Sequence, residues 1–196
     1  MSKRVGVMVV LAFCVSFALS DVCYALRLLN KEEALKKVFE PGVEITTENK
    51  ELAQAVLSKI KERLGGNLFF TQKGSKLQGV EDKGSVEFYF ASKNGEKIGV
   101  AVIDAEPGKW GAVEFIIAMD IKGVVTRVEV MSSEEKRGQP VSRSSFTGQY
   151  KGKTGKDALV VGKDITGISG ATITSRCATF AVKKAIVLYE ELYLNK

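Results

Sequence analysis

The feature that most constrains the fold of this chain is a change in the period of its apolar residues at Asn67. Beyond this point apolar and polar side chains alternate, which is typical of strands with one buried face. A single long helical pattern with a wide apolar face then runs from Ala171 to Leu194. We therefore expect an α+β fold, in which an antiparallel sheet packs against a long C-terminal helix. The expected strands span residues 68–70, 85–90, 97–104, 113–118 and 124–131.

Two turn signals separate the expected strands. Asn94-Gly95 predicts a tight hairpin, and the segment from Asp120 to Gly123 makes a second hairpin plausible. The stretch from Glu134 to Gly155 is polar and rich in Ser, Gly and Lys. It predicts a loop with about one helical turn around Phe146, which should anchor the loop to the core.

Residues 26–66 predict a helical N-terminal part before the expected domain of residues 67–196. Asn30 and Glu33 resemble a capping box, so a short helix is expected over residues 32–39. Residues 43–46 alternate weakly and could form a strand. A second helix is expected over residues 48–64, where an apolar residue recurs at every fourth position.

The first 25 residues have the order of a secretory signal peptide. Lys3 and Arg4 precede an uncharged apolar run over residues 5–19, which is followed by small-residue endings. This run is shorter than the roughly 20 residues of a transmembrane helix. We expect cleavage after Ala25, with an uncleaved anchor as the alternative. Both predict a chain exported to the periplasm or to the extracytoplasmic face of the membrane.

The residue composition excludes several kinds of catalytic site. The chain has 0 histidines, which removes Ser-His-Asp catalysis, His-ligated zinc and axial-His haem. Its 3 cysteines form no C-x-x-C pair, and Cys177 is expected to be a small buried residue. No residue has the pattern of a catalytic group or metal ligand. Any chemistry must therefore come from an organic cofactor.

The stretch from Asp164 to Ser175, directly before the last helix, is rich in Gly and hydroxyl residues. Backbone N–H groups and the positive end of a helix dipole favour an anion such as phosphate at this position. Gly167 and Gly170 would let the backbone turn tightly and approach a ligand. The alternative is that Ser169 or Thr172 is an ordinary N-cap.

A family resemblance bears on this choice. The run from Ser169 to Ser175 (S-G-A-T-I-T-S) resembles the S-G-A-T-x-T/S signature of the FMN-binding domain family. That family includes the covalently flavinylated subunits of the sodium-pumping NADH:quinone oxidoreductase and of the Rnf electron-transport complex. Upstream, residues 128–131 followed by Glu135 and Gly138 are similar to the family's strand and its E-T-P-G-x-G loop. The resemblance covers residues 95–194, about half of the chain.

The resemblance implies that Thr172 carries FMN through a phosphoester bond. A magnesium-dependent flavin transferase would form this bond outside the cytoplasm. Trp110, the only tryptophan, could stack on the flavin ring or remain a loop aromatic. The expected cofactor-binding residues are Thr172, Ser169, Gly170, Ala171, Ile173, Thr174, Glu135, Gly138 and Trp110.

The chain departs from the family pattern at two places. Thr166 stands where an acidic residue is frequent, and Asp164 is the nearest carboxylate. This bears on recognition by the transferase. The loop after Glu135 contains Arg137, which could meet a negative group of the flavin or of a partner.

The resemblance also implies a function, which is electron transfer between redox partners of a membrane electron-transport chain. The expected partners are the flavin transferase and membrane or periplasmic redox proteins; nucleic acid is not expected. Two alternatives remain at this point. One is an FMN-dependent reductase with its own small acceptor, and the other is a flavin-free extracytoplasmic binding module.

Overall fold

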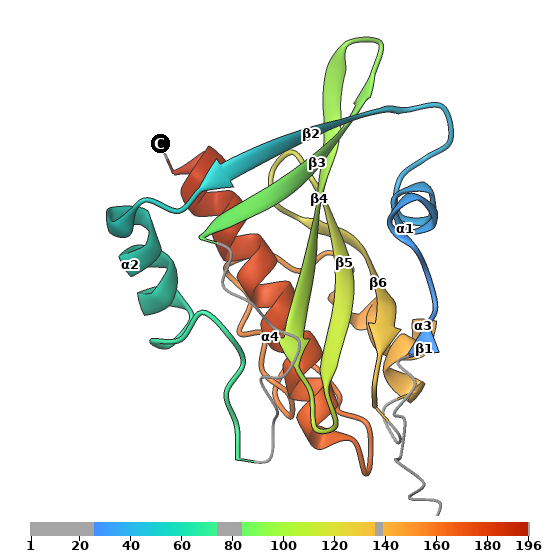
Figure 1. The fold of residues 1–196 in the computed structure, drawn as a ribbon, viewed down its shortest axis with the longest axis vertical. Coiled ribbons are helices and arrows are strands. Elements are labelled where there is room, and N and C mark those ends of the chain that lie inside the picture. The colour runs from blue at the N-terminus through green and yellow to red at the C-terminus, as the bar shows by residue number, and fades with distance from the viewer. Residues whose placement is uncertain (1–25, 74–83, 136–138, 196) are drawn as a thin grey trace, which may run out of the picture.

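The computed structural model describes residues 26–73, 84–135 and 139–195. Within these ranges six antiparallel strands form one sheet in the order β1-β6-β5-β4-β3-β2, and the long helix α4 crosses one face of it (Figure 1). This confirms the expected α+β architecture. The segment predicted to be the export signal lies outside the described residues.

The four central strands form a meander close to the expected one. Asn94 (φ 53°) and Gly95 (φ 82°) make the turn of the first hairpin in the left-handed region, as this dipeptide predicts. In the second hairpin the Asp120 carboxylate accepts hydrogen bonds from the Lys122 and Val124 N–H groups at 2.8 and 2.9 Å. These strands are β3 (Ser85–Lys93), β4 (Glu96–Pro107), β5 (Ala112–Asp120) and β6 (Val125–Ser133).

Both edges of the sheet come from the N-terminal part of the described chain. β1 (Leu26–Arg27) pairs with β6, and β2 (Glu44–Glu51) pairs with β3 along its whole length. The helix that was expected from residue 48 therefore begins later, as α2 (Gln54–Arg63). The backbone hydrogen bonds to β3 outweigh the local helical pattern at the C-terminal end of β2.

The strand predicted for residues 68–70 is wrong. No strand forms there, and the Phe70 N–H donates to the carboxylate of Glu106 at 2.7 Å. The Phe70 ring packs against Phe180 of α4, with 6.1 Å between ring centroids. The apolar residues of this segment thus cover the helix, which a run of three apolar residues cannot distinguish from strand pairing.

Helices cover the two faces of the sheet. α4 (Thr172–Tyr189) continues as a π-helical turn over Glu190–Leu194 and buries the larger core. α1 (Lys31–Val38) lies on the opposite face over a smaller cluster and has the capping box expected at Asn30. Among the residues that the structure describes, no helix is both long and apolar enough to cross a membrane.

The described part of the connection from β6 to α4 contains three short helical segments. A 3₁₀ turn over Gln139–Ser142 precedes α3 (Ser144–Thr147), and a second 3₁₀ turn spans Gly148–Tyr150. Phe146 is buried and packs edge-on against Tyr150, with ring centroids 5.7 Å apart. The helical turn and the anchoring function expected for Phe146 are confirmed.

Truncation of Phe88 tests how much the packing of the C-terminal helix against the sheet contributes to stability. Its side chain projects from β3 and is fully buried beneath the end of the C-terminal helix. The centroids of the Phe88 and Tyr193 rings lie 5.0 Å apart. We expect Phe88→Ala to lower the free energy of unfolding by about 3–5 kcal/mol, because truncation leaves a cavity. Urea denaturation measures this loss. Ile98→Ala, at an exposed strand position, is the control and should change stability by less than about 1 kcal/mol.

Candidate functional site

The N-terminus of α4 has no side-chain cap. The helix begins at Thr172, and the cap position is occupied by Ala171, whose methyl group accepts no hydrogen bond. The interpretation of Ser169 or Thr172 as an ordinary N-cap is therefore wrong. The first N–H groups of a helix have no acceptor within the helix, so they point outward beside Thr172.

Thr172 lies at the surface of the protein. Its side chain is exposed, as is that of Ser169. Gly170, between them in sequence, has φ 77° and produces the turn that leads the chain into the helix. The hydroxyl of Thr172 and the positive end of the α4 dipole thus share one solvent-accessible position.

A cavity of about 230 Å³ adjoins this helix start. In Figure 1 the turn between β4 and β5 lies near the start of α4, at the lower end of the sheet. The cavity brings together seven of the nine residues expected from the sequence. Ser169 is not among its lining residues, and Gly138 lies outside the described residues. The lining consists of Lys109, Trp110, Glu135, Gly170, Ala171, Thr172, Ile173 and Thr174.

Glu135 joins the walls of the cavity. One carboxylate oxygen accepts the Trp110 N–H at 2.8 Å, and the other accepts the Thr174 hydroxyl at 2.6 Å. The side chain is buried, and its own N–H donates to Ser133 Oγ at 3.1 Å. The carboxylate therefore links the end of β6, the β4–β5 turn and the first turn of α4. Hydrogen bonds to a buried carboxylate are among the stronger ones in proteins.

Lys109 is a lining residue that the sequence analysis missed. Its side chain is exposed, and its ammonium lies 5.4 Å from the centre of the Trp110 ring. Its position in the sequence could have indicated this, because Lys109 is a cation next to the only tryptophan, between Gly108 and Gly111. Gly108 and Gly111 are required because a Cβ at either would collide with Glu135 or Glu134.

Buried hydroxyl groups hold the glycine-rich turn against α4. Ser175 Oγ accepts from the Ile168 N–H and donates to the Ala171 carbonyl, both at 3.0 Å. Thr179 donates to the Ser175 carbonyl at 2.8 Å and shares a 2.9 Å hydrogen bond with Tyr150. These contacts fix the path of the chain into Thr172 from the side facing the core.

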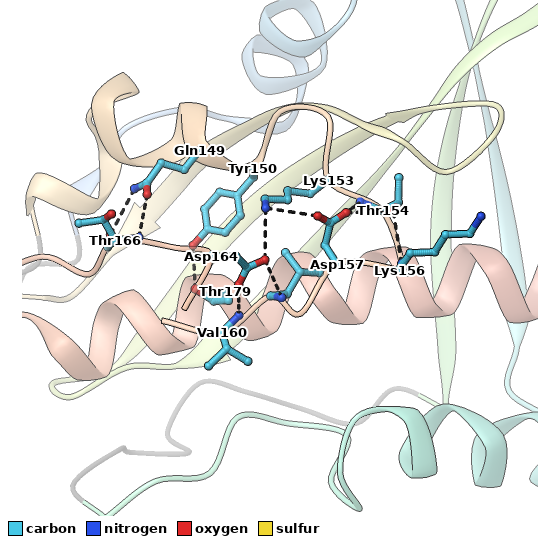
Figure 2. Close-up of polar contacts among 11 residues, drawn as sticks. Gln149, Tyr150, Lys153, Thr154, Lys156, Asp157, Val160, Asp164, Thr166 and Thr179 are labelled. Carbon is cyan, nitrogen blue, oxygen red and sulfur yellow. Dashed lines mark hydrogen bonds and ion pairs between the residues drawn. The ribbon is translucent and has the colours of Figure 1, made fainter. Parts of the chain in front are cut away.

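Asp164 and Thr166 support the same turn (Figure 2). The side-chain amide of Gln149 accepts from the Thr166 N–H at 2.8 Å and donates to its carbonyl at 3.2 Å. Asp164 accepts from the Val160 and Leu159 N–H groups and from Lys153, at 2.8, 3.0 and 3.2 Å. Burial opposes ionisation of Asp164, but these three donors together lower its pKa below the ordinary value.

Removing the Asp164 charge should loosen this loop. We expect Asp164→Asn to lower the free energy of unfolding at pH 7 by about 1–3 kcal/mol, because it weakens a hydrogen-bonded carboxylate. Since folding lowers this pKa, the stabilisation is present above about pH 3.8 and is lost as pH falls through the folded value. The free energies of unfolding of wild type and Asp164→Asn, measured by denaturation, should therefore approach each other as the pH falls from 7 to 3. Lys163→Gln, an exposed change in the same loop, should leave the pH profile unchanged.

Glu135→Ala should open the cavity wall. Alanine leaves no side-chain acceptor for the Trp110 N–H or the Thr174 hydroxyl. We expect hydrogen exchange of the Trp110 amide to accelerate by about tenfold or more. The emission of Trp110, the only tryptophan, should shift to the red. Glu44→Ala, at an exposed position of β2, is the control, and equal spectra for the two variants would contradict the assignment.

Comparison with known proteins agrees with this geometry. The FMN-binding domain family matches residues 108–187, which include the β4–β5 turn and nearly all of α4. A component of the proton-translocating ferredoxin:NAD(+) oxidoreductase complex of Clostridium ljungdahlii is 36% identical over 123 residues, or 58% of this chain and 63% of that protein. A component of the Na(+)-translocating ferredoxin:NAD(+) oxidoreductase complex of Acetobacterium woodii is 32% identical over 117 residues, or 55% of this chain and 56% of that protein.

The chain thus spans about 56–63% of the length of these two curated relatives. Among solved structures, NqrC of Shewanella oneidensis is similar with a TM-score of 0.45 and 16% identity, over 71% of this chain and 76% of that one. The family match includes the residues that form the start of α4 and the cavity lining. The chain thus matches the FMN-binding domain family over residues 108–187.

Proposed function

We propose that this protein carries FMN as a phosphoester on Thr172 and transfers electrons within an ion-translocating ferredoxin:NAD⁺ oxidoreductase complex. The observation that carries this proposal is the exposed hydroxyl of Thr172 at an uncapped helix N-terminus, beside a cavity lined by Trp110 and Lys109. When bound, FMN supplies one- and two-electron redox chemistry that protein side chains lack.

The lining residues suit the two ends of this cofactor. The first N–H groups of α4 and the ammonium of Lys109 would stabilise the negative charge of a phosphodiester. The Trp110 ring offers an aromatic face for a planar heterocycle. The other predicted residues that line the cavity, from Gly170 to Thr174, belong to the turn and first helical turn that surround the attachment point.

The size of the cavity favours an electron carrier. Pockets that enclose a whole small molecule usually measure about 300–1,000 Å³, whereas this cavity measures about 230 Å³. An attached flavin would thus lie partly at the surface, where a redox partner can approach it. Glu135 is the only carboxylate in the described lining, and both its oxygens already accept hydrogen bonds. This favours a carrier over a reductase with its own acid–base residues.

Export and maturation complete the proposal. The basic, apolar and small-residue order of residues 1–25 supports a secretory signal or an uncleaved anchor. The domain of residues 67–196 would then meet a flavin transferase and its redox partners at the extracytoplasmic face. Residues 26–66 would complete the sheet of this domain through β1 and β2.

Substitution of Thr172 tests the attachment. Wild-type protein, co-produced with an active flavin transferase and exported, should gain the mass of FMN minus water on the peptide that contains Thr172. We expect Thr172→Ala to abolish this adduct completely, since the accepting oxygen is gone, and Thr172→Ser to retain part of it. Intact-mass and peptide mass spectrometry measure both.

Thr126→Ala is the matched control, because Thr126 is also an exposed threonine but lies on β6 outside the cavity lining. This variant should be flavinylated like the wild type. An unmodified wild-type mass, with the transferase active on another target, would overturn covalent attachment. An adduct that persists in Thr172→Ala would assign it to another residue.

A further inference from the structure

A cluster of three charged side chains lies between β4 and α4, apart from the cavity lining; two of them are buried and Asp104 is partly exposed. Lys184 of α4 contacts Asp104 at 2.9 Å and also pairs with Glu106. Glu106 is 0% exposed and Lys184 is 4% exposed. Such groups are rarely buried, because desolvation of a charge is costly.

The charges of this cluster do not balance. Two carboxylates face one ammonium, so full ionisation would leave one net negative charge inside the protein. Glu106 uses both of its oxygens, one for Lys184 and the other for the Phe70 N–H at 2.7 Å. The second oxygen of Asp104 is buried and has no hydrogen-bond partner among the described residues. A bound proton would neutralise the excess charge of the cluster.

The groups that face Glu106 act in opposite directions on its protonation. Burial and then the charge of Asp104 raise the pKa of Glu106 to about 8, against the lowering effects of Lys184 and the Phe70 N–H. Cys177 also faces the cluster, and burial raises the pKa of its thiol, which remains neutral. Burial lowers the pKa of Lys184, but the two carboxylates raise it above its ordinary value, so Lys184 stays charged.

The cluster is connected to the proposed cofactor site through two short stretches of chain. Glu106 stands two residues before Gly108, at the start of the turn that contributes Lys109 and Trp110 to the cavity. Its carbonyl accepts a hydrogen bond from Cys177 at 3.6 Å. Cys177 lies five residues, or about 7.5 Å of helix axis, beyond Thr172.

We propose that Asp104, Glu106 and Lys184 form a buried proton-binding site that gains a proton when the cofactor at the start of α4 is reduced. This coupling rests on the proposed function. Added negative charge on the cofactor favours the protonated form of a nearby carboxyl group, and the low-polarity interior screens this effect less than water does. Asp104, whose side chain is 16% exposed, provides the contact with solvent.

The step balances in charge and atoms. With FMN bound, reduction would transfer one electron to it from an external one-electron donor. One proton would pass from water, which breaks one of its O–H bonds and leaves hydroxide in the solvent, to a carboxylate oxygen of the Asp104–Glu106 pair. No covalent bond of the protein other than this O–H bond forms. On reoxidation the electron leaves to the acceptor and the proton returns to solvent.

The proton-binding site itself can be tested without flavin. In the wild-type protein free of FMN, ¹³C NMR of the side-chain carboxyls should show one group of the Asp104–Glu106 pair titrating near pH 8. Glu106→Gln should remove this titration. If both carboxyls of the wild type titrate below about pH 5, the proton-binding site is disproved.

Coupling is tested in the flavin-loaded protein by reduction with dithionite in weak buffer at pH 8, with the protons taken up measured by an indicator dye. Wild type should take up more protons per electron than Glu106→Gln. Glu129→Gln is the matched control, since Glu129 is a paired carboxylate on β6 with ion pairs to Lys37 and Arg127, and it should match wild type. Equal uptake by wild type and Glu106→Gln would overturn the coupling. A chain that binds no FMN would overturn the proposed function and the coupling, whereas the NMR titration would still decide the proton-binding site.

Discussion

The packing of α4 against the sheet determines where every other functional feature lies. Most of its residues are buried, and Phe88 and Phe115 of the sheet lie in the same core cluster. The helix can therefore slide or rotate little without opening cavities in a close-packed core. Its N-terminus is thereby held at the end of the sheet where the β4–β5 turn projects. The core packing therefore also fixes the position of the exposed Thr172.

Polar contacts then connect this helix end to the loops around it. Glu135 links the β4–β5 turn to the first turn of α4, and Ser175 links the glycine-rich turn to the same helix. Asp164 and Gln149 support that turn by accepting hydrogen bonds from the N–H groups of Val160 and Thr166, respectively. These contacts hold the described part of the surface around Thr172 in one arrangement.

Charged residues occur in three distinct settings in this fold. Lys153 lies between Asp157 and Asp164 at 3.3 and 3.2 Å, so this cation of the lysine-rich loop stabilises the loop itself (Figure 2). Lys109, by contrast, lies exposed at the cavity beside Trp110. The cluster of Lys184, Asp104 and Glu106 is different again, because its charges are unequal and Glu106 and Lys184 are buried.

Local signals in the sequence were sufficient for the elements that depend on neighbours along the chain. The alternation of residues 85–131, the Asn94-Gly95 turn, the Asn30 capping box and the final helix were all predictable, because periodicity and turn chemistry act over a few residues. The S-G-A-T run likewise marked the start of α4. The tertiary structure alone decided that residues 68–70 cover α4, that β2 extends to Glu51, that Glu135 joins two walls of the cavity, and that Asp104, Glu106 and Lys184 meet. Each of these depends on contacts between segments far apart in sequence, whose free energy no local pattern records.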